Sequence, residues 1–234
     1  MKFGLLTTTD APLLGHLIKE LISINTLPDA IIFDSKGIQG KDKAIHEDRT
    51  EGKIPVIPLS HFKVKIPTYL VESHNDKNCI DIIVKKKIDL LVNAGTPRIL
   101  KGKILNITKQ GIINCHPGLL PDFRGCSCVE WAIYYDKKVG NTIHKLGNNI
   151  DDGPIICQEE LVFPKSYSYS DIRTNVFRGG NKLLAKIIND IRQSKITSDD
   201  YMKQNNGTHY KPIDQATLDI VKDKIKKKKY KYQI

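Results

Sequence analysis

Residues 3–35 read FGLLTTTDAPLLGHLIKELISINTLPDAIIFDS, and this stretch decides the fold. Two apolar runs, at 3–8 and 29–35, each predict a buried strand. Between them Asp10 can cap a helix, and Pro12 fits its first turn. The apolar residues of this helix recur at helical spacing, at positions 13, 14, 17, 18, 21 and 22. A strand, a helix and a second strand in this order predict a parallel sheet with a right-handed crossover.

The rest of the chain continues this alternation of strands and helices. Further strands are expected at 66–72, 89–95, 111–115, 141–146, 154–163 and 208–213. Helices are expected at 76–87, at 126–135, from Ser170 or Asp171 to about 193, and at 214–227. Residues 36–65 are polar and punctuated by glycine and proline, so they have no clear assignment. The predicted fold class is α/β: a Rossmann-like, mostly parallel sheet flanked by helices, with one domain at 1–195 and a small strand and helix extension at 196–234.

Composition indicates an ordinary globular protein. The 234 residues are 40% hydrophobic and 27% charged, which is enough apolar material for a single core. The N-terminus lacks the apolar run of a signal peptide, and no apolar stretch approaches 18 residues, so we expect no membrane span and a cytoplasmic location. The five cysteines are odd in number and form no CxxC pair, which favours reduced thiols and no metal site.

The net charge of +11 is concentrated at the C-terminus, where seven lysines and one aspartate from Lys222 onward contribute +6. These lysines alternate with two tyrosines in the segment DKIKKKKYKYQI. Such a tail can bind phosphate backbones or an acidic membrane surface. It is more often a solvated extension, and we favour that reading of the Lys-rich tail.

Two short motifs carry the residues that could do chemistry. Asn114 and His116 alternate in phase at the end of an expected strand, so both side chains point to the same side. Ligands of open parallel sheets bind beyond the carboxyl ends of the strands, which is where His116 is expected. An acidic turn, Asp151-Asp152-Gly153, follows later in the chain. A single histidine at a strand end is more often structural, so a catalytic reading requires this turn to fold back beside it.

The segment from about 89 to 160 resembles the folate-dependent formyltransferases. The matching stretches are AGTPRIL at 94–100, GIINCHPGLLPDFRG at 111–125, WAI at 131–133 and VGNTIHKLGNNIDDGPIICQE at 139–159. This family includes the glycinamide ribonucleotide, methionyl-tRNA and sugar N-formyltransferases. The resemblance implies the formyltransferase fold for residues 1–195 and N10-formyltetrahydrofolate as the formyl donor. It also implies a catalytic trio of Asn114, His116 and Asp151.

The family's folate-binding segments also fall on identifiable positions of this chain. The resemblance places donor contacts on Arg98, Ile99, Leu100, Leu146, Gly147, Asn149 and Ile150. When an amine attacks the formyl carbon, the carbonyl oxygen becomes negative, and Asn114 and a protonated His116 can both donate to it. A nearby ionised Asp151 is expected to raise the pKa of His116. His116, or a water held by Asp151, can then relay the proton from the amine. No metal is needed for this chemistry.

The acceptor is inferred from departures from the family pattern. The turn after the first strand, TTTDAPL, has no glycine and contains an acid, so it suits a phosphate monoester poorly. Some 40 residues follow the long helix, too few for the nucleic-acid-binding barrel of the methionyl-tRNA enzymes. We therefore expect a sugar N-formyltransferase that modifies a nucleotide-linked amino sugar, such as a dTDP-4-amino-4,6-dideoxyhexose of surface polysaccharide (O-antigen or lipopolysaccharide) biosynthesis.

Other acceptors and another class of function stay open at this point. Glycinamide ribonucleotide and methionyl-tRNA are the alternative acceptors, and a nucleic-acid-binding protein with an inactive scaffold is the alternative class. Nucleic acid is the less expected partner, because no stacking or base-reading elements are evident. Related sugar enzymes are often dimers, so a homodimer is expected, with the strand at 208–213 as the candidate interface.

Several side chains have two readings each. Thr8 and Thr9 could contact the acceptor or cap the strand end, and Arg124 could face a sugar pyrophosphate or pin its own loop. Trp131 could stack on a base, although a single tryptophan in a helix is more often part of the core. His144 could support the acidic turn, but a structural strand histidine is the more common case.

Overall fold

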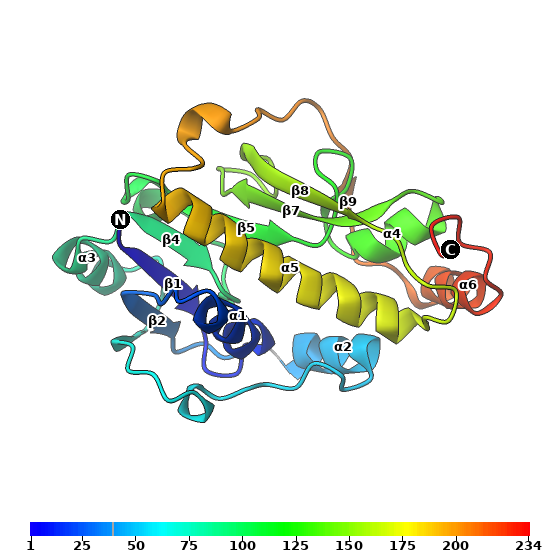
Figure 1. The fold of residues 1–234 in the computed structure, drawn as a ribbon, viewed down its shortest axis with the longest axis horizontal. Coiled ribbons are helices and arrows are strands. Elements are labelled where there is room, and N and C mark those ends of the chain that lie inside the picture. The colour runs from blue at the N-terminus through cyan, green and yellow to red at the C-terminus, as the bar shows by residue number, and fades with distance from the viewer. Residues whose placement is uncertain (39) are drawn as a thin grey trace.

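The computed structural model describes residues 1–38 and 40–234, and its centre is a seven-stranded sheet (Figure 1). The strands lie in the order β3-β2-β1-β4-β5-β7-β8. Their bounds are β1 Phe3–Thr7, β2 Ala30–Asp34, β3 Thr68–Val71, β4 Leu90–Asn93, β5 Ile112–His116, β7 Val139–Lys145 and β8 Ile155–Leu161. The first five in this order are parallel, whereas β7 and β8 are antiparallel to their neighbours. The prediction of a mostly parallel α/β sheet is confirmed.

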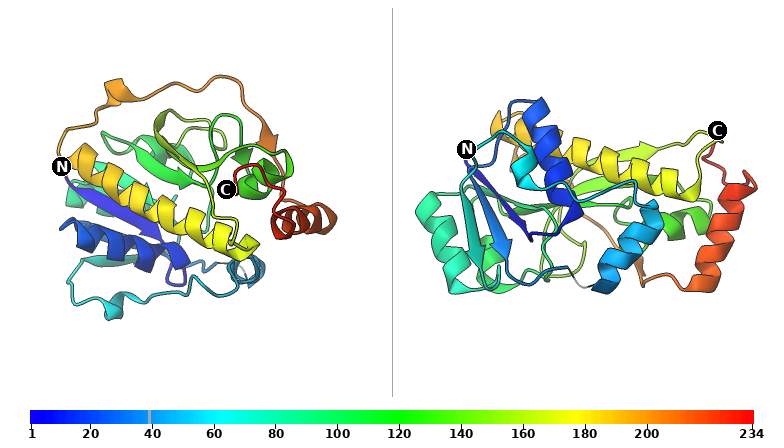
Figure 2. Two further views of the ribbon diagram at one scale, coloured as in Figure 1. Left: turned by 45° about the vertical axis from the view of Figure 1, so that its right-hand side comes forward. Right: turned by 90° about the horizontal axis from the view of Figure 1, so that it is seen from below.

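Helices cover both faces of the sheet because the strands carry apolar residues on both sides. Helices α1 (Pro12–Ser23) and α5 (Tyr169–Arg192) pack on one face, where they enclose Leu5, Val92 and Ile113. Helix α3 (Lys77–Lys86) and the 3-10 helix η2 (Gly102–Asn106) cover the other face. Figures 1 and 2 show α5 running across the sheet beside α1.

Two features of the helices could not be read correctly from the sequence. Asp10 is not the cap of α1, because Ala11 holds the cap position and the Asp10 carboxylate instead accepts a hydrogen bond from the Ile38 N–H at 3.2 Å. Helix α5 passes through Gly179 and Gly180 without a break. A Cβ at Gly180 would lie 2.9 Å from the Cys115 sulfur, so glycine lets the helix approach β5 closely.

Part of the unassigned segment 36–65 forms helix α2 (Gly40–Thr50), followed by the short 3-10 helix η1 (Leu59–His61). Helix α2 is joined to the body through Glu130 of helix α4 (Cys128–Tyr134). The Glu130 carboxylate is fully buried, with Arg49 and Arg173 each 3.6 Å away, and it accepts a 2.5 Å hydrogen bond from the Tyr169 hydroxyl. Burial opposes ionisation of Glu130, but the two arginines and Tyr169 together lower its pKa.

The C-terminal segment returns to the body of the protein. After the 3-10 helix η3 (Ser198–Asp200), strand β9 (His209–Tyr210) pairs in parallel with β6 (Arg124–Gly125), which comes from the loop after His116. Helix α6 (Gln215–Lys226) packs on α4. The expected strand near 208–213 is therefore present, and in this chain its partner is β6.

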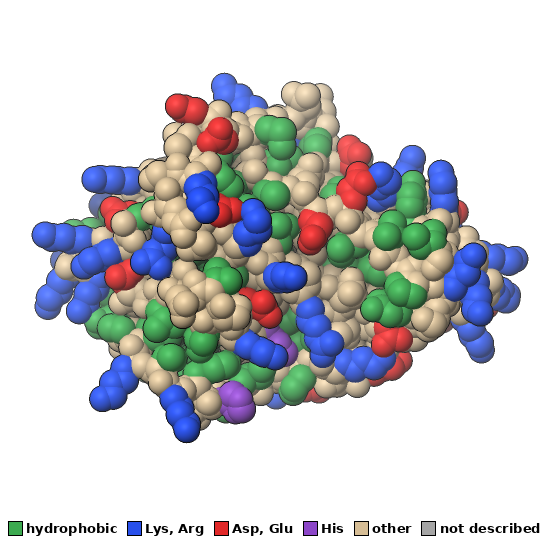
Figure 3. Space-filling model, viewed as in Figure 1, with side chains coloured by type: hydrophobic (Ala, Val, Ile, Leu, Met, Phe, Trp, Pro, Cys, Tyr) green, Lys and Arg blue, Asp and Glu red, His purple; other side chains and the backbone are tan. Residues whose placement is uncertain are grey.

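The Lys-rich tail is not a solvated extension. Tyr230 is buried, and its hydroxyl donates a 2.7 Å hydrogen bond to the Lys137 carbonyl. The Phe163 N–H donates to the Tyr232 carbonyl at 2.9 Å, which ties the chain end to the segment after β8. The apolar faces of the two tyrosines explain this packing, since lysines can point outward between them. Figure 3 shows lysine and arginine side chains projecting at the end of the molecule that holds α6.

Candidate active site

The predicted catalytic residues meet at the carboxyl edge of the sheet. The acidic turn folds back beside β5, and the His116 Nδ1 atom lies 3.3 Å from Asp151 Oδ2. Asn114 lies on the same strand two residues earlier, and it shares a cleft of about 760 Å³ with Asp151. The condition that made a catalytic reading of His116 plausible, an acid folded beside it, is therefore present in the structure.

His116 is buried, with 4% of its surface exposed, and both ring nitrogens face hydrogen-bond acceptors. Its Nε2 atom donates to the Phe123 carbonyl at 2.7 Å, while Nδ1 faces the Asp151 carboxylate. Burial lowers the pKa of His116 below its usual value, although Asp151 and the Phe123 carbonyl act to raise it. The expectation that Asp151 would raise this pKa was wrong in its net direction, because desolvation outweighs the attraction.

The Asp151 carboxylate is positioned by a strained, tightly packed turn. Asp151 adopts a left-handed backbone conformation with φ of 53°, and its Oδ2 atom accepts a hydrogen bond from the Gly125 N–H at 2.9 Å. Gly153 allows the turn to pass under β7, because a Cβ there would lie 1.8 Å from the Lys145 carbonyl oxygen. The Gln204 amide donates to the carbonyls of Asp151 and Gly153 and so holds the turn from the C-terminal segment.

His144 belongs to the same cluster. It is fully buried on β7, opposite Asn114 of β5, and its Nε2 atom lies 3.6 Å from Asp151 Oδ1. Its Nδ1 atom donates to the Lys145 carbonyl at 3.1 Å. Burial strongly lowers the pKa of His144, so the ring is neutral near pH 7. Of its two sequence readings, the structure shows the contact with the acidic turn.

The Asn114 amide is hydrogen-bonded on both sides. Its Oδ1 atom accepts from Asn93 Nδ2 at 3.0 Å, and its Nδ2 atom lies 3.1 Å from His144 Nε2. Asn93 ends β4, the neighbouring parallel strand. The amide therefore sits at the junction of three strand ends, with one further N–H of Nδ2 available on the cleft side.

The walls of the cleft fit a folate donor. Two segments line it, one after β4 and one after β7, and they include every residue predicted for donor binding: Arg98, Ile99, Leu100, Leu146, Gly147, Asn149 and Ile150. Ile99 and Ile150 are 74% and 51% exposed, so apolar surface is presented to the cleft. Asp152 Oδ1 is buried without a hydrogen-bond partner among the described residues, and a pterin ring, rich in N–H donors, would supply one.

Arg98 is anchored rather than free. Its Nε atom donates to Asp34 Oδ2 at 2.7 Å, and its Nη2 atom donates to the Glu72 carbonyl at 2.9 Å. Asp34 is buried at the end of β2. Although burial opposes its ionisation, hydrogen bonds from Arg98 and from the Lys36 and His74 N–H groups lower its pKa. The arginine thus fixes the loop that forms one wall of the cleft.

The residues with two sequence readings are engaged within the chain. Thr8 is buried, and its hydroxyl donates to the Asp34 carbonyl at 3.2 Å, whereas Thr9 is exposed. The Arg124 guanidinium donates to Gln204 Oε1 and to the Asn205 carbonyl, which pins the β6 loop. The Trp131 ring stacks on Tyr210, and its Nε1 atom donates to the Lys211 carbonyl.

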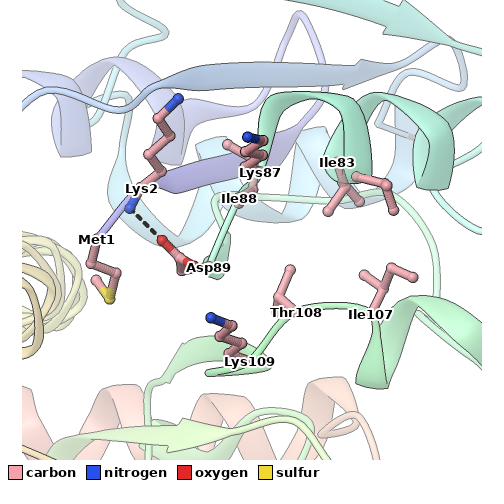
Figure 4. Close-up of a pocket in the computed structure, with 10 residues that line it drawn as sticks. Met1, Lys2, Ile83, Lys87, Ile88, Asp89, Ile107, Thr108 and Lys109 are labelled. Atoms are coloured by element: carbon pink, nitrogen blue, oxygen red, sulfur yellow. Dashed lines mark hydrogen bonds between the residues drawn. The ribbon is translucent and has the colours of Figure 1, made fainter.

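A second cavity of about 550 Å³ lies at the opposite edge of the sheet (Figure 4). Lys2, Asp89 and Lys109 line it, and each precedes the start of a parallel strand. The Lys2 N–H donates to the Asp89 carboxylate at 2.8 Å. Asn114, His116 and Asp151 gather at the carboxyl ends of the strands, so this cavity is remote from them.

Among the described side chains, those of residues 1–38, 40 and 43–234, no group of three or more histidine, cysteine, aspartate or glutamate residues is arranged to hold a metal ion. Within the same residues, no helix combines the length and the apolar character that crossing a membrane requires.

Comparison with known proteins identifies the family. A family model described as formyl transferase matches residues 16–188, which is well over half of the chain. The chain belongs to this family. Members of the family use N10-formyltetrahydrofolate, in agreement with the sequence resemblance.

Named relatives differ in their acceptors. A methionyl-tRNA formyltransferase from Clostridium beijerinckii is 30% identical over 214 residues, covering 89% of this chain and 64% of the relative. The chain thus spans about half to two thirds of the length of the curated relatives it matches first. A phosphoribosylglycinamide formyltransferase from Anaplasma phagocytophilum superposes with a TM-score of 0.63 at 22% identity, covering 90% of this chain and 99% of that one. A 4-N formyltransferase from Francisella tularensis does so with a TM-score of 0.60 at 24% identity, covering 91% and 76%. At these identities the two structures establish the fold.

Two residues of the site were missed by the sequence analysis, Asn93 and Gln204. Asn93 ends an apolar strand and looks like an ordinary turn-forming residue, and Gln204 lies in a polar connection. Their roles arise from contacts to Asn114, Arg124 and the acidic turn, which are distant in sequence, so no local pattern could indicate them.

Proposed function

We propose that this protein transfers a formyl group from N10-formyltetrahydrofolate to the primary amine of a nucleotide-linked amino sugar. The observation that carries the formyl transfer is that Asn114 and Asp151 line one cleft whose walls are the predicted donor-binding segments, with His116 3.3 Å behind Asp151. An amide donor, an enclosed imidazole and a carboxylate suit acyl transfer to an amine, which develops negative charge on oxygen and releases a proton from nitrogen.

Asn114, Asp151 and His116 have different roles in this reaction because they lie at different distances from the cleft. Bound N10-formyltetrahydrofolate supplies the formyl carbon. Asn114 lines the cleft and offers its second Nδ2–H to the carbonyl oxygen as that oxygen gains negative charge. Asp151 also lines the cleft and accepts, directly or through water, the proton that the amine loses. His116 lies behind Asp151, and its Nδ1 atom can hold this proton and return it through the Asp151 carboxyl group to the donor nitrogen, which is reprotonated as the old bond breaks.

One observation favours an amino sugar over glycinamide ribonucleotide as the acceptor, because enzymes named for either kind of acceptor share the fold of this chain. The turn after β1 carries the Asp10 carboxylate next to the first turn of α1, where a phosphate monoester would otherwise find the positive end of the helix. The acceptor we propose is a dTDP-4-amino-4,6-dideoxyhexose of surface polysaccharide biosynthesis, handled in the cytoplasm by a homodimer.

The curated relatives favour a second candidate, methionyl-tRNA. Several matching proteins carry that activity in their names. Helix α6 and the residues after it hold seven lysines, of which three are already paired: Lys222 with Asp48, Lys224 with Asp136 and Lys227 with Asp223. The remaining lysines could contact a phosphate backbone in a salt-dependent way.

A panel of amines tests the proposed acceptor. The protein is incubated with N10-formyltetrahydrofolate and, separately, with dTDP-amino sugars, glycinamide ribonucleotide and charged initiator tRNA. A mass gain of one formyl group on the sugar amines alone supports the proposal, and the same gain on charged tRNA alone replaces it with the second candidate. If no amine is formylated and tetrahydrofolate does not bind, the proposed formyl transfer by this chain is wrong. Light scattering of the same sample measures whether the protein is a dimer.

A further inference from the structure

We propose that Asn93 is a positioning residue that orients the catalytic amide of Asn114 and couples it to the cofactor-binding loop. This inference rests on the proposed formyl transfer, because it concerns which group Asn114 presents to the cleft. The backbone N–H groups of Gly95 and Thr96 donate to Asn93 Oδ1 at 3.1 and 3.0 Å.

The orientation of both asparagines follows from these two backbone donors. A backbone N–H can only donate, so the Asn93 oxygen must face the loop and its Nδ2 must face Asn114. The 3.0 Å contact then requires the oxygen of Asn114 on that side. The Nδ2 atom of Asn114 is consequently turned toward His144 and the cleft, which is the orientation that formyl transfer requires.

The hydrogen bonds of His144, at the other end of this series, independently indicate the same orientation of Asn114. The Lys145 carbonyl can only accept, so His144 Nδ1 must carry a proton. In a neutral ring Nε2 is then an acceptor, and it receives one N–H of Asn114 at 3.1 Å. The other N–H of Asn114 has no acceptor among the described residues and is the one left for the carbonyl oxygen. At one end the Gly95 and Thr96 N–H groups can only donate, and at the other end the Lys145 carbonyl can only accept. Together they fix the direction of every hydrogen bond between Asn93 and His144.

The consequence is a link between donor binding and catalysis. Gly95 and Thr96 begin the loop that continues to Arg98, Ile99 and Leu100 along the wall of the cleft. Displacing this loop removes the two N–H groups that hold the Asn93 oxygen, and with them the bias on Asn114. A correctly placed loop therefore holds the amide in its donating orientation before the acceptor arrives.

The substitution Asn93→Asp separates the two roles of this residue. A carboxylate still accepts from the Gly95 and Thr96 N–H groups, so the loop keeps its support, but it cannot donate to Asn114. We expect the turnover number to fall about 10²- to 10³-fold, the size of a lost oxyanion donor, with little change in the KM for the folate donor. In an Asn114→Ala background the same substitution should have no further effect on turnover. Wild-type turnover in Asn93→Asp, or an equal loss in both backgrounds, would overturn the proposal.

A second measurement needs neither substrate. Ring nitrogen chemical shifts from ¹⁵N NMR report where His144 carries its proton. We expect Nδ1–H in both proteins, and in Asn93→Asp a changed Nε2 chemical shift, because the turned Asn114 would present its oxygen to Nε2 and no longer donate to it. Unchanged shifts in Asn93→Asp would contradict the proposal even if the reaction proved to be a different one. Thr108→Val is the matched control: it removes a buried 2.9 Å hydrogen bond to the Gly111 carbonyl at the other end of the sheet, and it should change neither measurement.

Discussion

Two enclosed carboxylates of this protein, Glu130 and Asp151, have opposite kinds of partners. Glu130 is fully buried between Arg49 and Arg173, whose guanidinium groups stay charged at any physiological pH. Asp151 lies between the rings of His116 and His144, which are titratable groups although burial lowers the pKa of both. A carboxylate held by arginines can only stabilise a fold, whereas one held by histidines can also take part in proton transfer. The difference lies in the partner, since both acids are enclosed.

The largest effect should come from removing the charge at Asp151. Asp151→Asn keeps an oxygen for the Gly125 N–H, and asparagine tolerates the left-handed backbone at this position. We expect turnover to fall by about 10²- to 10⁴-fold, the usual share of general acid–base catalysis, with little change in the melting temperature. Steady-state kinetics and thermal unfolding measure the two quantities. Turnover within threefold of the wild type would remove Asp151 from the mechanism.

The complementary substitution, Glu130→Gln, should act on stability alone. It leaves two partly buried arginines without their counter-charge, and breaking a buried ion pair costs at most about 3–5 kcal/mol of unfolding free energy. Urea unfolding measures the loss, and turnover per folded molecule should be unchanged. Glu160→Gln, an exposed glutamate paired with Lys138, is the matched control and should unfold like the wild type. A large loss of turnover in folded Glu130→Gln would place this cluster in the reaction after all.

The pH dependence of the unfolding free energy should also distinguish the Asp151 cluster from the Glu130 cluster. Burial lowers the pKa values of His116 and His144, so the unfolded chain binds protons below about pH 6.5 that the folded protein does not. The unfolding free energy should therefore fall as the pH drops from 7 toward 5. The pKa of Glu130 is also lowered, but its contribution is lost only at pH values below the usual range of glutamate. Urea unfolding between pH 5 and 7.5 tests this, and His144→Gln should flatten the slope. A flat wild-type profile would show that the histidines are not held neutral.

The smallest effect is expected at the surface. Lys138 and Glu160 form an exposed ion pair between neighbouring strand ends, where solvent and salt screen the attraction. Lys138→Ala should leave both turnover and the urea midpoint unchanged within error. A clear loss of stability would mean that charge pairs outside the two enclosed clusters matter more than their exposure suggests.

The sequence was sufficient where local patterns determine structure. The alternation of Asn114 and His116 predicted that both side chains lie on one side of β5, and the resemblance to the formyltransferases selected the turn that brings Asp151 to His116. It failed where the outcome depends on distant partners. Helix α2 is too polar to show a buried face in its sequence, and it is held through Arg49 and Glu130.

The pKa of His116 shows why electrostatics could not be read from residue types. An acid near a histidine suggests a raised pKa, but the actual direction depends on how completely the ring is enclosed. Enclosure here comes from the β6 loop and the Phe123 carbonyl, which are placed by pairing with β9 near the C-terminus. Likewise, Asn93 resembles any other residue at a strand end until β4 and β5 are brought side by side.

The hydrogen bonds of Gln204 have a consequence for the protein during its synthesis. The chain emerges from the ribosome N-terminus first, and Asn114, His116 and Asp151 are all made before residue 204. Until Gln204 arrives, the carbonyls of Asp151 and Gly153 lack the amide that holds their turn, and β6 lacks its partner. A nascent or prematurely released chain that ends before residue 204 thus contains Asn114, His116 and Asp151 but lacks the hydrogen bonds and the strand pairing that hold the acidic turn and the β6 loop from the C-terminal side.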